Sequence, residues 1–148
     1  MINTALIKIG AGAGALLAGA GVALLSPSSP AVAYSSPPLF LDVSIQSPAH
    51  LVAKGAAVAV PVTTICSGTN QAYLQVQVTE RVGKKVASGS KYVTVGCTGS
   101  RQQTVVTVPS TSGTAFSKGS AYAVAYLDGC TYYFCGEENN NATIKITS

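Results

Sequence analysis

The sequence contains no tryptophan, one histidine and few charged residues, and each shortage excludes a class of protein. Charged residues make up only 9% of the 148 residues. Without tryptophan, the chain lacks the Cys–Trp–Cys core of antibody domains. The single histidine, His50, follows a proline in a turn-like segment, with no patterned nucleophile or acid partner. We therefore expect no catalytic residue, no metal site and no cofactor, in a protein that is not an enzyme.

Acidic residues are too few for hydrolysis by paired carboxylates, which needs two acids across a cleft. Only five are present, and the adjacent Glu137 and Glu138 would face opposite ways on a strand. Without Lys8, the eight remaining Lys and Arg residues exceed the acids by three. This surplus is too small to indicate nucleic-acid binding.

The N-terminus has the pattern of a secretory signal peptide. Lys8 precedes an uninterrupted run of apolar and small residues over 9–25, and Ala31-Val32-Ala33 suits a signal peptidase. We expect cleavage before Tyr34, so that residues 1–33 are removed. The mature protein would then be secreted, extracellular or associated with the cell surface, without stable membrane insertion. Retention of the run as a membrane anchor is the alternative, at the lower end of the length that spans a bilayer.

The mature sequence has the length of one domain. Residues 34–38 form an extended lead-in, and residues 39–148 alternate between apolar and polar positions, which is typical of strands with one buried face. About seven such strands predict an all-β, immunoglobulin-like two-sheet sandwich, with a closed barrel as the alternative. The inward series are Leu41/Val43/Ile45, Val58/Val60/Val62, Leu74/Val76/Val78, Val93/Val95, Val106/Val108 and Ile144/Ile146.

Four cysteines behind a signal peptide indicate two disulfides. Cys66 continues the inward series of residues 58–62, and Cys97 continues that of residues 93–95, so these two thiols should meet. Cys130 and Cys135 bracket four residues and can close a local loop. We predict the pairs Cys66–Cys97 and Cys130–Cys135. A four-thiolate zinc site is the rival, but the usual close cysteine pairs are absent.

The loop between Cys130 and Cys135 carries three consecutive aromatic residues, Tyr132, Tyr133 and Phe134. A disulfide would hold these rings in a pre-ordered arrangement, as binding surfaces require. The alternative is that the loop folds back and packs its rings over an open end of the domain. We identify the three aromatic residues as the candidate binding site.

Two further features have weaker interpretations. The stretch 137–141, with Asp128, offers oxygen ligands for calcium, or is a solvated turn before the last strand. Arg81, Lys84, Lys85 and Lys91 cluster around one hairpin, and either contact an anionic envelope or protect a sheet edge from aggregation.

The C-terminal part carries a family resemblance. Cys130 and Cys135 precede a Gly/Asn-rich turn and a short final strand over 142–147. This part resembles the neocarzinostatin-type apoproteins, secreted actinobacterial β-sandwiches with two disulfides that carry an apolar chromophore. The chain departs from them because Cys66 and Cys97 lie 31 residues apart and its charge is basic. As a whole it resembles the small secreted Ig-like proteins of actinobacteria.

We therefore expect a secreted, non-catalytic binding module. Its aromatic loop would contact a protein or an envelope component that the sequence does not identify. The first alternative is a carrier that holds a small apolar ligand in a cavity lined by Tyr73, Tyr92, Tyr122 or Tyr126. A further alternative is a protease inhibitor that presents the loop as a rigid pseudo-substrate.

Overall fold

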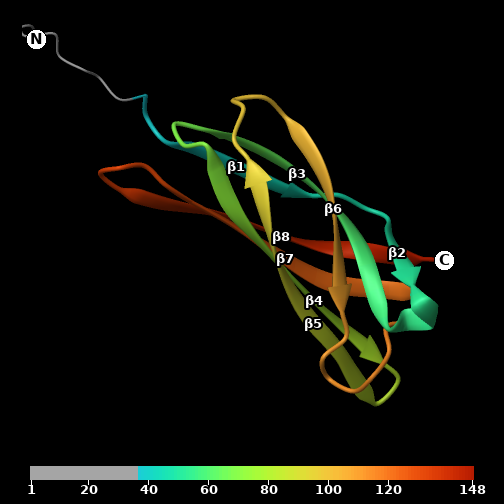
Figure 1. Ribbon diagram of the computed structural model, residues 1–148. Helices are drawn as coiled ribbons and strands as arrows, with labels where there is room; N and C mark the ends of the chain where they lie inside the picture. Colours follow the sequence, from blue (N-terminus) through green and yellow to red (C-terminus); the bar gives the residue numbers. More distant parts are fainter. Residues whose placement is uncertain (1–36) are drawn as a thin grey trace, which may run out of the picture. The chain divides into compact units, whose positions relative to one another are not determined.

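The computed structural model describes residues 37–148. The predicted signal peptide, residues 1–33, lies outside this part, as does most of the lead-in. The described chain is all-β, with eight strands, one short 3₁₀ turn and no α-helix (Figure 1). The strands are β1 (Phe40–Ile45), β2 (Ala49–Val52), β3 (Ala57–Ser67), β4 (Gln71–Val82), β5 (Lys85–Gly96), β6 (Gln102–Pro109), β7 (Gly119–Cys130) and β8 (Cys135–Thr147).

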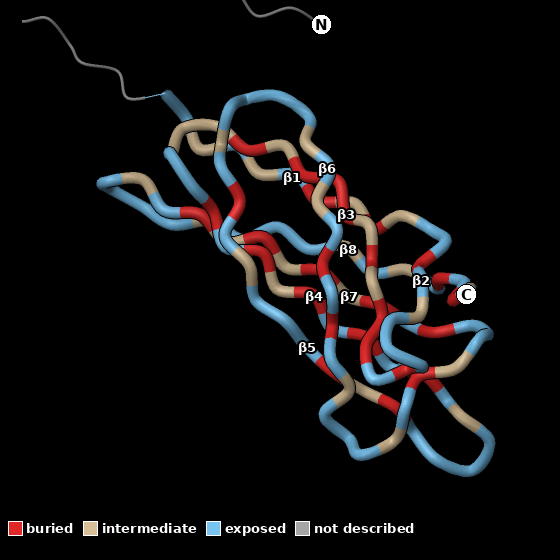
Figure 2. The backbone as a smooth tube through the Cα atoms, turned by 45° about the vertical axis from the view of Figure 1, so that its right-hand side comes forward, coloured by how far each residue is buried: buried red, intermediate tan, exposed pale blue. Residues whose placement is uncertain are grey.

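The strands form one hydrogen-bonded sheet, in which neighbouring strands follow the order β1-β3-β2-β8-β7-β4-β5. Strands β1 and β2 pair with different parts of the same edge of β3, and β6 pairs with its opposite edge. The pairs are antiparallel except that of β2 with β8, which joins Ala49 to Ile146 and His50 to Thr147. The sheet bends so that β1 lies near β7 and β8, and β6 lies near β5, without pairing (Figures 1 and 2). Among residues 37–148, β5 pairs with β4 alone and β6 with β3 alone. The sheet therefore does not close, contrary to the barrel alternative.

The core lies between the two facing parts of the sheet. Buried and exposed residues alternate along most strands, and Figure 2 shows this as repeated changes of colour along the tube. Leu74 of β4 and Leu127 of β7 are fully buried and directly opposite each other. The alternating pattern correctly predicted which side of the central strands faces the core, because successive side chains of a strand point to opposite faces. The other large, fully buried apolar side chains are Val58, Val60, Val62, Val76, Val78, Val106, Val108, Ile144 and Ile146.

Two sequence predictions need correction. The segment around His50 is not a turn but strand β2, which pairs with both β3 and β8. The stretch 137–141 is not a turn before the last strand, because β8 already begins at Cys135. The connection between β6 and β7, whose sequence is mostly polar, contains a buried aromatic ring, Phe116.

Candidate functional site

The candidate site lies at the tip of the β7–β8 hairpin. Cys130 and Cys135 are paired residues at the end of the two strands, and their side chains form a disulfide. Behind it, Gly129 and Gly136 face Leu39 and Leu41, and a Cβ at either glycine would lie 3.1 Å from a leucine methyl group. The two small residues therefore let the hairpin pack closely against the start of β1. We call residues 131–134 the aromatic tip.

Thr131 organises the aromatic tip. Its backbone N–H donates to the carbonyl oxygen of Phe134 at 2.8 Å, which closes the turn. Its hydroxyl donates to the same oxygen at 3.0 Å, and accepts from the N–H groups of Tyr133 at 3.3 Å and Phe134 at 3.1 Å. This role of Thr131 was not predicted from the sequence. It could have been suspected, because Ser and Thr hydroxyls often form hydrogen bonds with nearby backbone groups in turns.

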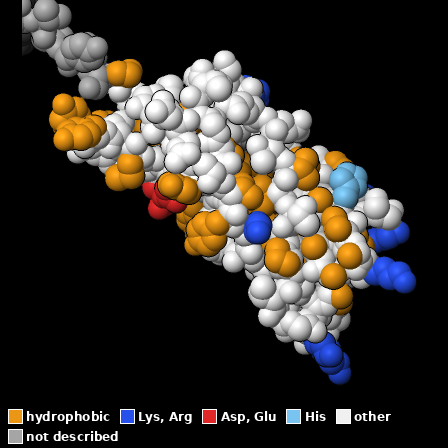
Figure 3. Space-filling view, in the orientation of Figure 1, with side chains coloured by type: hydrophobic (Ala, Val, Ile, Leu, Met, Phe, Trp, Pro, Cys, Tyr) orange, Lys and Arg blue, Asp and Glu red, His pale blue; other side chains and the backbone are white. Residues whose placement is uncertain are grey.

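The three predicted binding residues are exposed. The exposed fractions are 94% for Tyr132, 75% for Tyr133 and 52% for Phe134. The two tyrosine rings pack edge to face, with centroids 5.1 Å apart. Hydrophobic side chains also gather on the end of the molecule where the hairpin tip lies (Figure 3). The aromatic tip thus points outward and does not fold back over the domain, contrary to the packing alternative.

A groove of about 330 Å³ adjoins the aromatic tip. One wall comes from residues 39–41 and the other from residues 134–138, so Phe134 belongs to both features. Phe40 is exposed there, although Leu41 packs against the core. The sequence pattern does not reveal this groove, because its two walls are almost a hundred positions apart in the chain. The local signal was the run Leu39-Phe40-Leu41, which is apolar on both faces of a strand.

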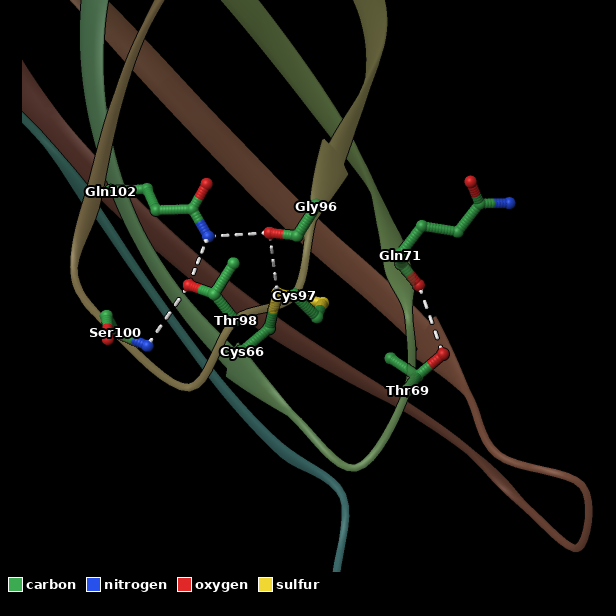
Figure 4. Close-up of a disulfide and its surroundings, with 8 residues drawn as sticks. All are labelled: Cys66, Thr69, Gln71, Gly96, Cys97, Thr98, Ser100 and Gln102. Atoms are coloured by element: carbon green, nitrogen blue, oxygen red, sulfur yellow. Dashed lines mark hydrogen bonds between the residues drawn. A yellow bond between two sulfur atoms is a disulfide. The ribbon is translucent and has the colours of Figure 1, made fainter.

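The second disulfide joins Cys66 to Cys97, as predicted, and lies at the same end of the domain, because Cys66 is paired with Leu41 of β1. Figure 4 shows its surroundings. The amide of Gln102 donates to the Gly96 carbonyl at 2.7 Å and to the Thr98 hydroxyl at 3.0 Å. The Gln102 bonds thus hold the β5–β6 connection together, and the disulfide and the hydrogen bond from the Gly99 N–H to the Cys66 carbonyl at 2.9 Å attach it to β3.

The weaker candidates do not gather into sites. Within residues 37–148, no three His, Cys, Asp or Glu side chains lie close enough to hold a metal ion. Asp128 and Glu137 are directly opposite each other on β7 and β8. Lys91 lies opposite Val76, six residues along β5 from Lys85, which is about 20 Å at the rise of a strand. It therefore does not belong to the basic cluster at the β4–β5 turn.

The tyrosines of the predicted carrier cavity do not line the groove. Tyr73, Tyr92 and Tyr122 are at least half exposed, on the outward side of their strands. His50, the only histidine, is exposed and contacts the C-terminus, with Nδ1 3.0 Å from the Thr147 hydroxyl.

No helix in the described part of the chain is long and apolar enough to cross a membrane. Compared with known proteins, the sequence matches no protein-family model and shows no significant similarity to a curated protein.

Proposed function

We propose that this protein is a secreted, non-catalytic binding module that contacts a protein or envelope component through the aromatic tip. The observation that carries the proposal is the exposure of Tyr132, Tyr133 and Phe134 on a turn closed by a disulfide. Large aromatic groups left in water are unfavourable in a free protein, and mark interaction sites when they cluster. Because Thr131 and the disulfide already order the turn, binding costs little further conformational entropy.

The proposed scaffold is an immunoglobulin-like sandwich. Strands β1, β3 and β6 would form one layer and β8, β7, β4 and β5 the other, with β2 pairing at the edge of both. Each layer contains neighbours from distant parts of the chain, β3 with β6 in one and β4 with β7 in the other, as in the Greek-key connections of such sandwiches. Their loops cluster at the two ends, and the aromatic tip occupies one end.

Secretion is supported by the sequence pattern over 1–33 together with the two disulfides. Disulfides persist in oxidising compartments and are rare in the cytosol. The four cysteines are all bonded, so the described chain has no free thiolate for nucleophilic catalysis.

Site-specific photo-crosslinking in the secreting host tests the proposal. A photoreactive phenylalanine analogue replaces Tyr133, and a matched control carries it at Val105, an exposed position on β6. We expect one covalent adduct from position 133 that is absent from position 105, and a weaker adduct when Thr131→Val loosens the tip. A secreted protease as the adduct would identify the inhibitor alternative. Equal labelling from both positions, or none from position 133, would contradict a binding role for the tip.

A carrier of a small apolar ligand is the second candidate, favoured by the groove beside Phe134. Its volume is at the lower end of the range of small-molecule sites. Native mass spectrometry of the secreted protein tests it. An added mass that leaves on denaturation, and that Leu39→Asp abolishes, would support a carrier. A bare polypeptide mass would leave the binding module as the proposal.

A further inference from the structure

A second surface with its own chemistry covers the outward side of β5, β4, β7 and β8. Gln75 of β4 lies opposite Tyr92 of β5 and Tyr126 of β7, and Tyr126 lies opposite Asn139 of β8. Side chains that are directly opposite share one face of a sheet, so these four residues form a row across it. We define the tyrosine–amide face as the outward side of residues 73–79, 88–94, 122–128 and 137–143.

The composition of this face is unusual for a surface in water. Three of its tyrosines are half exposed or more, with fractions of 55% for Tyr73, 63% for Tyr92 and 50% for Tyr122. Its charges are confined to Asp128 and Glu137, in the row nearest the disulfide of the hairpin. The other positions carry hydroxyl, amide or phenol groups, apart from Val124. The face is therefore polar and aromatic, but almost uncharged.

We infer that the tyrosine–amide face binds a neutral polysaccharide. A sugar ring presents an apolar C–H side, which packs on an aromatic ring, and hydroxyl groups around its edge. Phenols combine an apolar body with a polar end, and primary amides both donate and accept hydrogen bonds. An acidic polymer or an anionic membrane would need Lys or Arg, which the four rows lack, because Arg81 and Lys145 lie only in the next row, beyond Thr79 and Thr143.

The spacing of the rings fits an extended chain rather than one sugar. Tyr92 and Tyr126 are separated by one intervening strand, which places their backbones about 9.6 Å apart. Tyr122 lies four residues from Tyr126 along β7, about 13 Å away. A ligand that touches all three rings must extend over several sugar units.

This inference does not depend on the aromatic tip, so the two surfaces can be tested separately. Titration calorimetry with the hexasaccharides of cellulose, chitin, mannan and amylose provides neutral probes, and an oligogalacturonate provides an acidic one. We expect at least one neutral hexasaccharide to bind. Tyr92→Ala and Tyr126→Ala should each weaken that binding by roughly three- to tenfold. Tyr92→Phe, which keeps the ring, should retain most of it.

Tyr133→Ala is the matched control, because it removes an exposed tyrosine from the tip and leaves the face intact. Three results would overturn the inference: none of the four neutral probes binds, Tyr133→Ala abolishes binding while Tyr92→Ala does not, or the oligogalacturonate binds as tightly as the neutral probes. A fourth result that would overturn the inference comes from sedimentation equilibrium. A dimer that Tyr92→Ala dissociates would show that a second copy of the chain covers the face.

Discussion

The carboxylate of Glu80 accepts two hydrogen bonds from Ser117, one from the backbone N–H at 2.8 Å and one from the hydroxyl at 2.7 Å. Glu80 is buried near the end of β4, and Ser117 belongs to the connection between β6 and β7. Next to it, the N–H of Phe116 donates to the Gly55 carbonyl at 2.8 Å. The mostly polar connection between β6 and β7 is thus held to the domain by hydrogen bonds at two adjacent residues, Phe116 and Ser117.

Glu80→Gln should lower the free energy of unfolding by about 1–3 kcal/mol, because it weakens charge-assisted bonds at a buried site. Urea denaturation measures the change. Glu138→Gln, at an exposed position, is the control and should stay within about 0.5 kcal/mol of the wild type. Equal stability of the two variants would mean that the Glu80–Ser117 contact contributes nothing.

Gly89→Ala should destabilise the domain by about 1–3 kcal/mol, because overpacking strains a well-packed site. A Cβ at Gly89 would collide with the carbonyl oxygen of Pro109, where β5 approaches β6. Gly96→Ala, on the same strand, is a matched control, since no atom of the described part of the chain lies within 4 Å of a Cβ there. Its stability should be unchanged or slightly higher. Thermal unfolding compares the two, and an equal loss in both would point to a general intolerance of β5 to alanine.

The two disulfides should contribute unequally to stability. The Cys66–Cys97 bond spans 31 residues and the Cys130–Cys135 bond spans five. By chain entropy, removing the first as a double alanine variant should cost about 3.7 kcal/mol, and removing the second about 2.2 kcal/mol. Chemical denaturation of the two double variants gives the comparison. A larger loss from the short loop would show that the aromatic tip supports the fold.

Thr64→Val should stabilise the domain by about 1 kcal/mol. The Thr64 hydroxyl oxygen is buried on β3 and has no hydrogen-bond partner among residues 37–148, and an unsatisfied buried hydroxyl is costly. Thr107→Val, at an exposed position on β6, is the control and should have little effect. If Thr64→Val lowers the melting temperature, the hydroxyl has a partner, such as a buried water.

The alternating pattern predicted the central strands and the cysteine pairing, because both depend on which way a side chain points. Strand β2 escaped prediction because its partners, β3 and β8, decide its conformation, and Ile146 is remote from Ala49 in sequence. The aromatic residues of the tip were identified from sequence. Their outward direction was left open, since it depends on the hydrogen bonds of Thr131 and not on hydrophobicity. The groove could not be predicted, because it forms where residues 39–41 lie beside residues 134–138, and no local sequence pattern contains that contact.

The direction of the chain in β8 has a practical consequence for how this protein should be handled. Leu39, two residues after the start of the described chain, lines the groove, whereas β8 runs away from the tip to the C-terminus at the opposite end (Figure 1). Along β8 this distance is about 40 Å. A tag or fusion at Ser148 therefore leaves the aromatic tip unobstructed, and a protein immobilised through Ser148 presents the tip to solution. A fusion joined directly to Pro37 would begin two residues from Leu39, which lines the groove, and an assay built on it would measure a partly blocked surface.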